Sequence, residues 1–271
     1  MLKYFVLFFF WIFLFANSLF AKEWVVSSHP LSKIWAELFS EEKLYVITPP
    51  KGEFHFTEPT VKDWEAIKRA DFVIIVGSEP WAKRVYKLVP KEKIFSLAKQ
   101  EEKMIDPHLW FDLNRVEMLL KSFLSHPKVQ EKPYYEKAKL RVEQFLSKLR
   151  ELQKGYSALS TCREKQFYSI GHQVFYYLFK DTGIKEVSLI RGHHHGEISP
   201  KRLKEILVEA KRNQVKKMLL AEREFVKYKD FFIKEGFQVY EVWTGDYDMP
   251  GTFIELMLKN LETFKIILNC H

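Results

Sequence analysis

The sequence is poor in cysteine: Cys162 and Cys270 are the only two among 271 residues. In an oxidising compartment an even pair favours one disulfide, which would join positions roughly a hundred residues apart. Two unpaired thiols are the alternative. No cysteine lies near the end of the first apolar run, which argues against a lipid anchor attached there.

The chain also lacks the short motifs of several enzyme classes. It contains no H-E-x-x-H, no G-x-S-x-G and no phosphate-binding P-loop, so the familiar zinc-protease, hydrolase and nucleotide sites are missing. Glu197 and Glu222 are carboxylates that a zinc hydrolase could use as a general base, but their spacing implies no mechanism. We therefore expect no enzyme and keep an exported zinc-dependent hydrolase only as an alternative.

Acidic residues are outnumbered, 35 against 43 lysines and arginines, which gives a formal net charge of +8. A basic balance can indicate a nucleic-acid partner. Here the basic residues lack interleaved aromatic ones and lie in helical stretches such as KAKLRVEQFLSKLRELQK, residues 137–154. This pattern favours a solvated basic surface and no nucleic-acid partner.

Near its start the chain has one positive charge, Lys3, followed by an apolar run from Tyr4 to Ala16. The run is short for a membrane span and ends in small residues, which predicts a signal peptide over residues 1–21. Cleavage after Ser18 and an uncleaved anchor are the alternatives. We expect an exported protein, located in the periplasm.

Apolar, β-branched runs alternate with helical patterns on both sides of a charged middle, residues 133–155. Alternation of this kind predicts parallel sheets covered by helices. The predicted fold is α/β, with two Rossmann-like lobes, each a parallel-rich sheet flanked by helices, joined by one long connecting helix. The predicted domains are 1–21 (signal peptide), 22–126 (N-terminal lobe), 127–157 (connecting helix) and 158–271 (C-terminal lobe).

Three histidines directly follow predicted strands. His55 comes after YVIT, His108 after IFSL and His172 after FYSI, at the start of a helix predicted to reach Lys180. Ligands bind at the carboxyl ends of parallel strands, so the three imidazoles can converge between the lobes. Three histidines with an oxygen ligand are ordinary zinc chemistry. For any one histidine alone, packing or surface exposure is the simpler interpretation.

The remaining histidines are weaker candidates. His29 begins a predicted helix and is interpreted as a local cap or wall residue, and His126 and His271 as surface residues. The triplet His193–His195 in RGHHHGE either collects zinc at the cleft mouth or forms a solvated loop before the helix cap Ser199.

Several stretches resemble one family over essentially the whole chain after residue 21. They are VVSSHPLSKIWAELF, GEFHFTEPTVKDWEAIKRADFVIIVG, DPHLWFD, YSIGHQVFYYLFKDTGI and FIELMLKNLETF, of which DPHLWFD is the most specific. The family is that of the zinc- and manganese-specific substrate-binding proteins of bacterial ABC transporters (cluster A-I, ZnuA-like). Many zinc members carry a long histidine-rich loop in the N-terminal lobe, which this chain lacks.

The resemblance implies that His55, His108 and His172 are metal ligands. Histidine at the third position is similar to zinc members, whereas manganese members usually carry glutamate there. For the fourth ligand the aligned position holds Trp243. We predict that Asp246 takes this role.

Asp248 and a water molecule are the alternatives for that fourth place. The resemblance further implies a protein that carries Zn²⁺ as transported ligand in its inter-lobe cleft and delivers it to an ABC-type membrane permease. Mn²⁺ or another divalent ion is the alternative cargo, and a monomer is expected. Imidazoles must be neutral to bind metal, so capture should weaken as the pH falls through the histidine range. An adhesive surface protein that needs metal for folding is disfavoured, because lobes of this size hold their own cores.

Overall fold

The computed structural model describes residues 23–100, 102, 106–190 and 198–270. The signal peptide predicted at 1–21 lies outside these residues, and so do His193–His195, Glu197 and His271.

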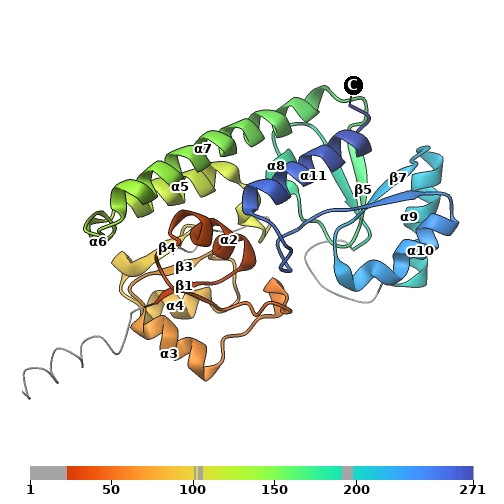
Figure 1. Ribbon diagram of the computed structural model, residues 1–271. Helices are drawn as coiled ribbons and strands as arrows, with labels where there is room; N and C mark the ends of the chain where they lie inside the picture. Colours follow the sequence, from red (N-terminus) through yellow and green to blue (C-terminus); the bar gives the residue numbers. More distant parts are fainter. Residues whose placement is uncertain (1–22, 101, 103–105, 191–197, 271) are drawn as a thin grey trace, which may run out of the picture.

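Two parallel four-stranded sheets form the framework of the fold (Figure 1). The first has the strand order β2-β1-β3-β4 and the second β6-β5-β7-β8. The strands are β1 Trp24–Val26, β2 Leu44–Val46, β3 Val73–Ile75, β4 Ile94–Ser96, β5 Gln166–Ile170, β6 Lys185–Ser188, β7 Lys217–Leu220 and β8 Gln238–Glu241. The central strands β1 and β3, WVV and VII, are buried throughout, as parallel strands covered on both faces must be. The predicted α/β fold with two such sheets is confirmed.

Helices connect and cover the strands. The α-helices are α2 His29–Leu38, α3 Val61–Arg69, α4 Ala82–Leu88, α5 Leu113–Leu124, α6 Pro127–Gln130, α7 Tyr135–Ala158, α8 Tyr176–Phe179, α9 Pro200–Arg212, α10 Val226–Lys234 and α11 Phe253–Ile267. The 3₁₀ turns are η1 Phe54–Phe56, η2 Lys91–Lys93, η3 Leu109–Phe111, η4 Leu159–Thr161 and η5 Arg223–Phe225. Below, the N-terminal lobe means the first sheet with α2–α5, and the C-terminal lobe the second sheet with α8–α11.

The predicted long connecting helix is confirmed as α7. Two details differ from the sequence-based expectation. The first residues of the expected segment 127–157 form the separate short helix α6, because Pro133 between α6 and α7 cannot continue a helix. The helix expected from His172 begins only at Tyr176. The backbone N–H groups of the two residues before it donate to the Glu186 carboxylate instead of helical carbonyls.

One apolar core runs through both lobes. In the N-terminal lobe Trp24 contacts Phe72 and Phe123 edge to face, with ring centroids 5.4 and 5.1 Å apart. The same core continues along α7 to Phe175 and Phe264 in the C-terminal lobe, whose rings lie 5.1 Å apart. Because packed interiors resist deformation, this continuity ties the two lobes together.

The long helix α7 crosses both lobes with α11 beside it (Figure 1). The Tyr156 hydroxyl on α7 donates to the Met257 carbonyl of α11 over 2.9 Å, and α11 also packs against α2. In the described part of the chain, no helix has the length and apolar character needed to cross a membrane.

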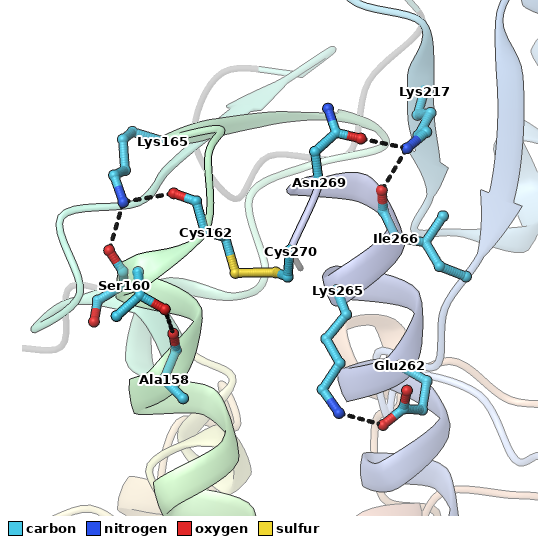
Figure 2. Close-up of a disulfide and its surroundings, with 11 residues drawn as sticks. Ala158, Ser160, Cys162, Lys165, Lys217, Glu262, Lys265, Ile266, Asn269 and Cys270 are labelled. Carbon is cyan, nitrogen blue, oxygen red and sulfur yellow. Dashed lines mark hydrogen bonds and ion pairs between the residues drawn. A yellow bond between two sulfur atoms is a disulfide. The ribbon is translucent and has the colours of Figure 1, made fainter.

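A disulfide joins Cys162, just after η4, to Cys270, three residues after α11 (Figure 2). The pairing expected from the two cysteines is therefore confirmed. Lys217 supports the same chain end by donating to the Ile266 carbonyl and to the Asn269 side chain, each over 2.6 Å.

Reduction of this disulfide should lower the free energy of unfolding by about 4 to 5 kcal/mol, because it frees a loop of 108 residues in the unfolded chain. Denaturant unfolding with and without dithiothreitol measures the loss. A Cys162→Ala, Cys270→Ala variant is the control and should not respond to the reductant. An unchanged unfolding midpoint for the reduced wild type would contradict the prediction.

Candidate metal centre

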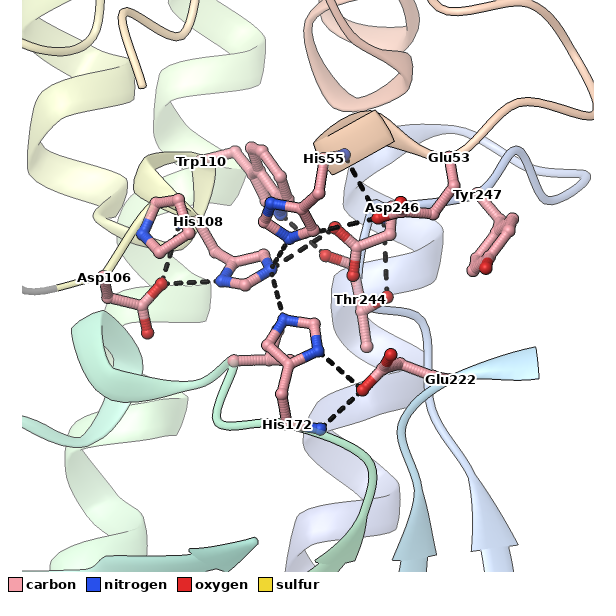
Figure 3. Close-up of polar contacts among 12 residues, drawn as sticks. Glu53, His55, Asp106, His108, Trp110, His172, Glu222, Thr244, Asp246 and Tyr247 are labelled. Atoms are coloured by element: carbon pink, nitrogen blue, oxygen red, sulfur yellow. Dashed lines mark hydrogen bonds and ion pairs between the residues drawn. The ribbon is translucent and has the colours of Figure 1, made fainter. Parts of the chain in front are cut away.

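Four side chains meet between the lobes and form the donor cluster: His55, His108, His172 and Asp246 (Figure 3). The His108 Nε2 atom lies 2.9 Å from His55 Nε2 and 3.2 Å from His172 Nε2. The Asp246 Oδ1 atom lies 3.3 Å from both His55 Nε2 and His108 Nε2. The four donor atoms all lie within 4.8 Å of one another, and apart from His55 the residues are buried.

His55 lies in the short 3₁₀ turn η1, after β2. The turn is held by Glu53, whose carboxylate accepts a hydrogen bond from the His55 backbone N–H over 3.1 Å. Next to it, the Phe54 ring packs edge to face on Trp110 at 5.0 Å. These contacts fix the turn so that the imidazole points toward the other lobe.

His108 immediately precedes η3, in the loop after β4. Asp106 Oδ1 accepts hydrogen bonds from its backbone N–H over 2.8 Å and from its ring Nδ1 over 2.6 Å. A carboxylate on one imidazole nitrogen orients the other toward a metal and makes it more basic. Trp110 and Phe111 are fully buried beside it, as expected of residues that exclude water from the centre.

His172 follows β5 and has an equivalent partner in the C-terminal lobe. Glu222, two residues after β7, accepts hydrogen bonds through Oε1 from the His172 backbone N–H and from Nδ1, over 2.5 and 2.6 Å. Gly171 lets this carboxylate approach, since its φ is +152° and a Cβ there would lie 2.5 Å from Glu222 Oε1. The Glu222 carboxylate thus orients an imidazole and is not placed as a hydrolytic base.

Asp246 lies in the loop after β8 and is only 1% exposed. Within the described residues neither carboxylate oxygen has a hydrogen-bond partner. A buried carboxylate without hydrogen bonds is costly unless a positive charge compensates it. The donor set therefore fits a cation held between Asp246 and the imidazoles.

The other candidates lie elsewhere. Asp248 forms an ion pair with Lys33 at 2.9 Å, and Trp243 is buried with its indole N–H on the Tyr247 carbonyl. His29 is a buried wall residue whose Nε2 lies 3.4 Å from the Gly52 carbonyl. The helix cap at that point is its neighbour Ser28.

The expectation that His126 is a surface residue is only half right. Its ring is half-buried and packs edge to face on Phe72 and Phe95, at 5.0 and 5.8 Å.

The pKa values of the groups in and beside the donor cluster are shifted in different directions. Burial disfavours protonation of His108, but the Asp246 and Asp106 carboxylates outweigh it and raise its pKa to about 10. Burial lowers the pKa of His55 to about 4. Burial and the Asp246 charge raise the pKa of Glu53 to about 8. In the metal-free protein an imidazolium at His108 therefore balances the Asp246 charge.

The spacing of the donors suits a small tetrahedral ion. Zinc binds imidazole and carboxylate at about 2.0 to 2.2 Å, which places the donors of a regular tetrahedron roughly 3.3 Å apart. The short donor pairs at 2.9 to 3.3 Å approach this spacing.

Comparison with known families supports this interpretation of the centre. Residues 25–266 match the family described as ZnuA, zinc-uptake complex component A, periplasmic. The chain belongs to the ZnuA family. Its members are periplasmic solute-binding proteins, some of them lipoproteins, that bind metal ions and work with ABC transporter permeases, and they are not enzymes.

Individual relatives cover nearly the whole chain. The high-affinity zinc uptake system protein ZnuA of Bacillus subtilis strain 168 is 24% identical, over 89% of this chain and 86% of its own length. The Zn(II)-bound ZnuA-like domain of Streptococcus pneumoniae AdcA superposes with a TM-score of 0.75, at 20% identity, covering 92% of this chain and all of the domain. A manganese-bound periplasmic metal-binding protein of Candidatus Liberibacter asiaticus gives 0.71, at 15% identity, covering 91% and 100%. The fold is thus shared with proteins solved with either metal.

Sequence reasoning did not assign the carboxylates behind the imidazoles. Asp106 stands two residues before His108 in IDPH, and this close spacing was the signal that could have identified it as the partner of the His108 ring. Glu222 lies fifty residues from His172, so only the pairing of β5 with β7 brings them together.

In the metal-free protein, the His108 ring should be protonated throughout the neutral range and lose its proton near pH 10. Zinc must displace that proton, so the apparent affinity should fall by up to tenfold per pH unit below this pKa. NMR ¹⁵N chemical shifts of the histidine side chains measure the protonation state of each ring. Added zinc should make the His108 ring neutral at pH 7. His55, neutral down to about pH 4, is the internal comparison. A His108 titration near 6.5 would contradict the assignment.

Proposed function

We propose that this protein captures Zn²⁺ at the donor cluster and delivers it to an ABC-type membrane permease. The observation that carries the proposal is the buried Asp246 carboxylate, which accepts no hydrogen bond from the described residues and lies 3.3 Å from two imidazole nitrogens. A divalent ion at this point would compensate the charge and receive one ligand from each member of the cluster. Capture takes place between the lobes, because His172 comes from the opposite sheet to His55 and His108.

Zinc is the proposed cargo rather than manganese because the donors are three nitrogens and one oxygen. Imidazole suits zinc, whereas carboxylate, carbonyl and water suit manganese. The zinc uptake protein of Bacillus subtilis and the Zn(II)-bound domain of Streptococcus pneumoniae agree with this choice. The manganese-bound neighbour makes Mn²⁺ the competing candidate.

We further propose that capture and release need only small movements of the lobes. The core that runs through both lobes and the pairing of α7 with α11 oppose a wide opening. The metal would then leave when a small tilt or a loop movement breaks one ligand contact.

The chain without residues 1–21 should bind one tight equivalent of zinc, and His108→Ala should lose this binding or weaken it greatly. Competitive titration against a zinc chelator measures the affinity, and a parallel titration with Mn²⁺ should give weaker binding. His126→Ala is the matched control, because it removes a histidine outside the cluster.

Circular dichroism establishes that each variant is folded. No tight zinc site in the folded wild type would overturn the proposed function. Manganese binding tighter than zinc would transfer the proposal to that ion.

Small-angle scattering tests the limited opening. Because the lobes share a core, the radius of gyration should be the same, within error, for metal-free and zinc-bound protein. The control is the same pair of measurements on His108→Ala, which should not respond to zinc. A clear compaction of the wild type on zinc binding would show a wide hinge movement instead.

A further inference from the structure

The loop that carries Asp246, residues 244–251 (the Asp246 loop), connects β8 to α11 and so belongs to the C-terminal lobe by sequence. Its hydrogen bonds lead mainly to the N-terminal lobe. The Trp110 indole N–H donates to the Thr244 carbonyl over 2.8 Å, and the Phe54 N–H donates to the Asp246 carbonyl over 3.2 Å. The loop therefore reaches across to the two N-terminal turns that carry His55 and His108.

Lys33 on α2 makes three contacts with the Asp246 loop. Its ammonium donates to the Met249 carbonyl over 2.5 Å and to the Gly251 carbonyl over 3.1 Å. It also lies 2.9 Å from Asp248 Oδ1. An ammonium group has three donors, and here all three have an acceptor in the Asp246 loop.

The environment strengthens these contacts. The Lys33 side chain is only 13% exposed, so solvent screens its bonds less than those of a surface lysine. Gly245 lets the loop approach closely: its φ is +89°, and a Cβ there would lie 2.7 Å from Pro30 on the same helix and 2.5 Å from Trp110 Nε1.

Contacts of the loop with its own lobe lie mainly at its beginning. The Asn260 side chain of α11 pairs with both backbone groups of Trp243, the residue just before the loop. Within the loop, the Trp243 indole N–H donates to the Tyr247 carbonyl over 3.2 Å, and Arg223 reaches the Asp248 carbonyl at a long 3.5 Å. The contacts that hold the loop beside His55 and His108 therefore come mainly from α2 and the N-terminal turns.

We propose that Lys33 is a positioning residue for metal binding: it fastens the Asp246 loop to α2 so that the Asp246 carboxylate stays beside His55 and His108. This inference rests on the proposed function, because it takes Asp246 to be a metal ligand. Asp248, the rival candidate for the fourth ligand, then has a different task, as the ionic partner of Lys33. Release of the loop from Lys33 withdraws Asp246 and leaves the metal with the three imidazoles.

A double-mutant cycle with Lys33→Met and Asp246→Asn tests the inference. Methionine keeps the apolar stem of the side chain and removes the ammonium. In the wild-type background, Lys33→Met should weaken zinc binding about tenfold, as loss of a residue that orients a ligand does. The loss should appear in the rate of zinc release to excess chelator. In the Asp246→Asn background the same substitution should change nothing.

Lys211→Met is the matched control, because it removes an ion pair with Glu235 at the C-terminal ends of α9 and α10, which lead to the amino ends of β7 and β8, and it should leave zinc binding unchanged. If Lys33→Met does not fold, Asp248→Asn replaces it, with about threefold weaker binding expected because its exposed ion pair contributes less. An equal loss in both Asp246 backgrounds, or no loss in either, would overturn the positioning role. Unchanged zinc binding in Asp246→Asn alone would instead refute Asp246 as a ligand in the proposed function.

Discussion

The negative charge of Asp246 is buried between two lobes, and no hydrogen bond from the described residues compensates it. A charge in that position is tolerable only beside a positive partner. In the metal-free chain the partner is the His108 ring, whose pKa the same carboxylate helps to raise to about 10. A bound divalent ion would replace the proton on His108 as the positive charge beside Asp246. The weakening of capture as the pH falls through the histidine range stays a prediction, and the raised His108 pKa adds a pH dependence that extends to about pH 10.

Two of the imidazole rings are held in their orientation by carboxylates that bind the ring nitrogen pointing away from the cluster. Asp106 holds His108 and Glu222 holds His172, each through the ring nitrogen that faces away from the cluster. Both carboxylates also accept the backbone N–H of the same histidine. One side chain thus fixes the loop and the ring together, which reduces the entropy that metal binding would otherwise cost.

The family comparison and the geometry of the centre describe different aspects of metal binding. The family consists of periplasmic metal-binding proteins that work with ABC transporter permeases. The local structure adds how this chain would hold the ion: donors from both sheets, a core shared by the lobes, and a loop attached to α2 by Lys33. These features favour a centre that closes by small movements around a nearly fixed frame.

The sequence by itself determined the α/β class, the two sheets, and the convergence of His55, His108 and His172, because the carboxyl ends of parallel strands lie along one edge. It also indicated the disulfide, since only two cysteines exist. Tertiary structure decided that Asp246, and not Asp248, lies beside the imidazoles. Both stand in one loop, and only the distant contacts of Lys33 and Trp110 set which carboxylate faces inward. Glu222 and Lys33 were likewise invisible in their roles, because their partners lie 50 and more than 200 residues away, and no local pattern encodes such a pairing.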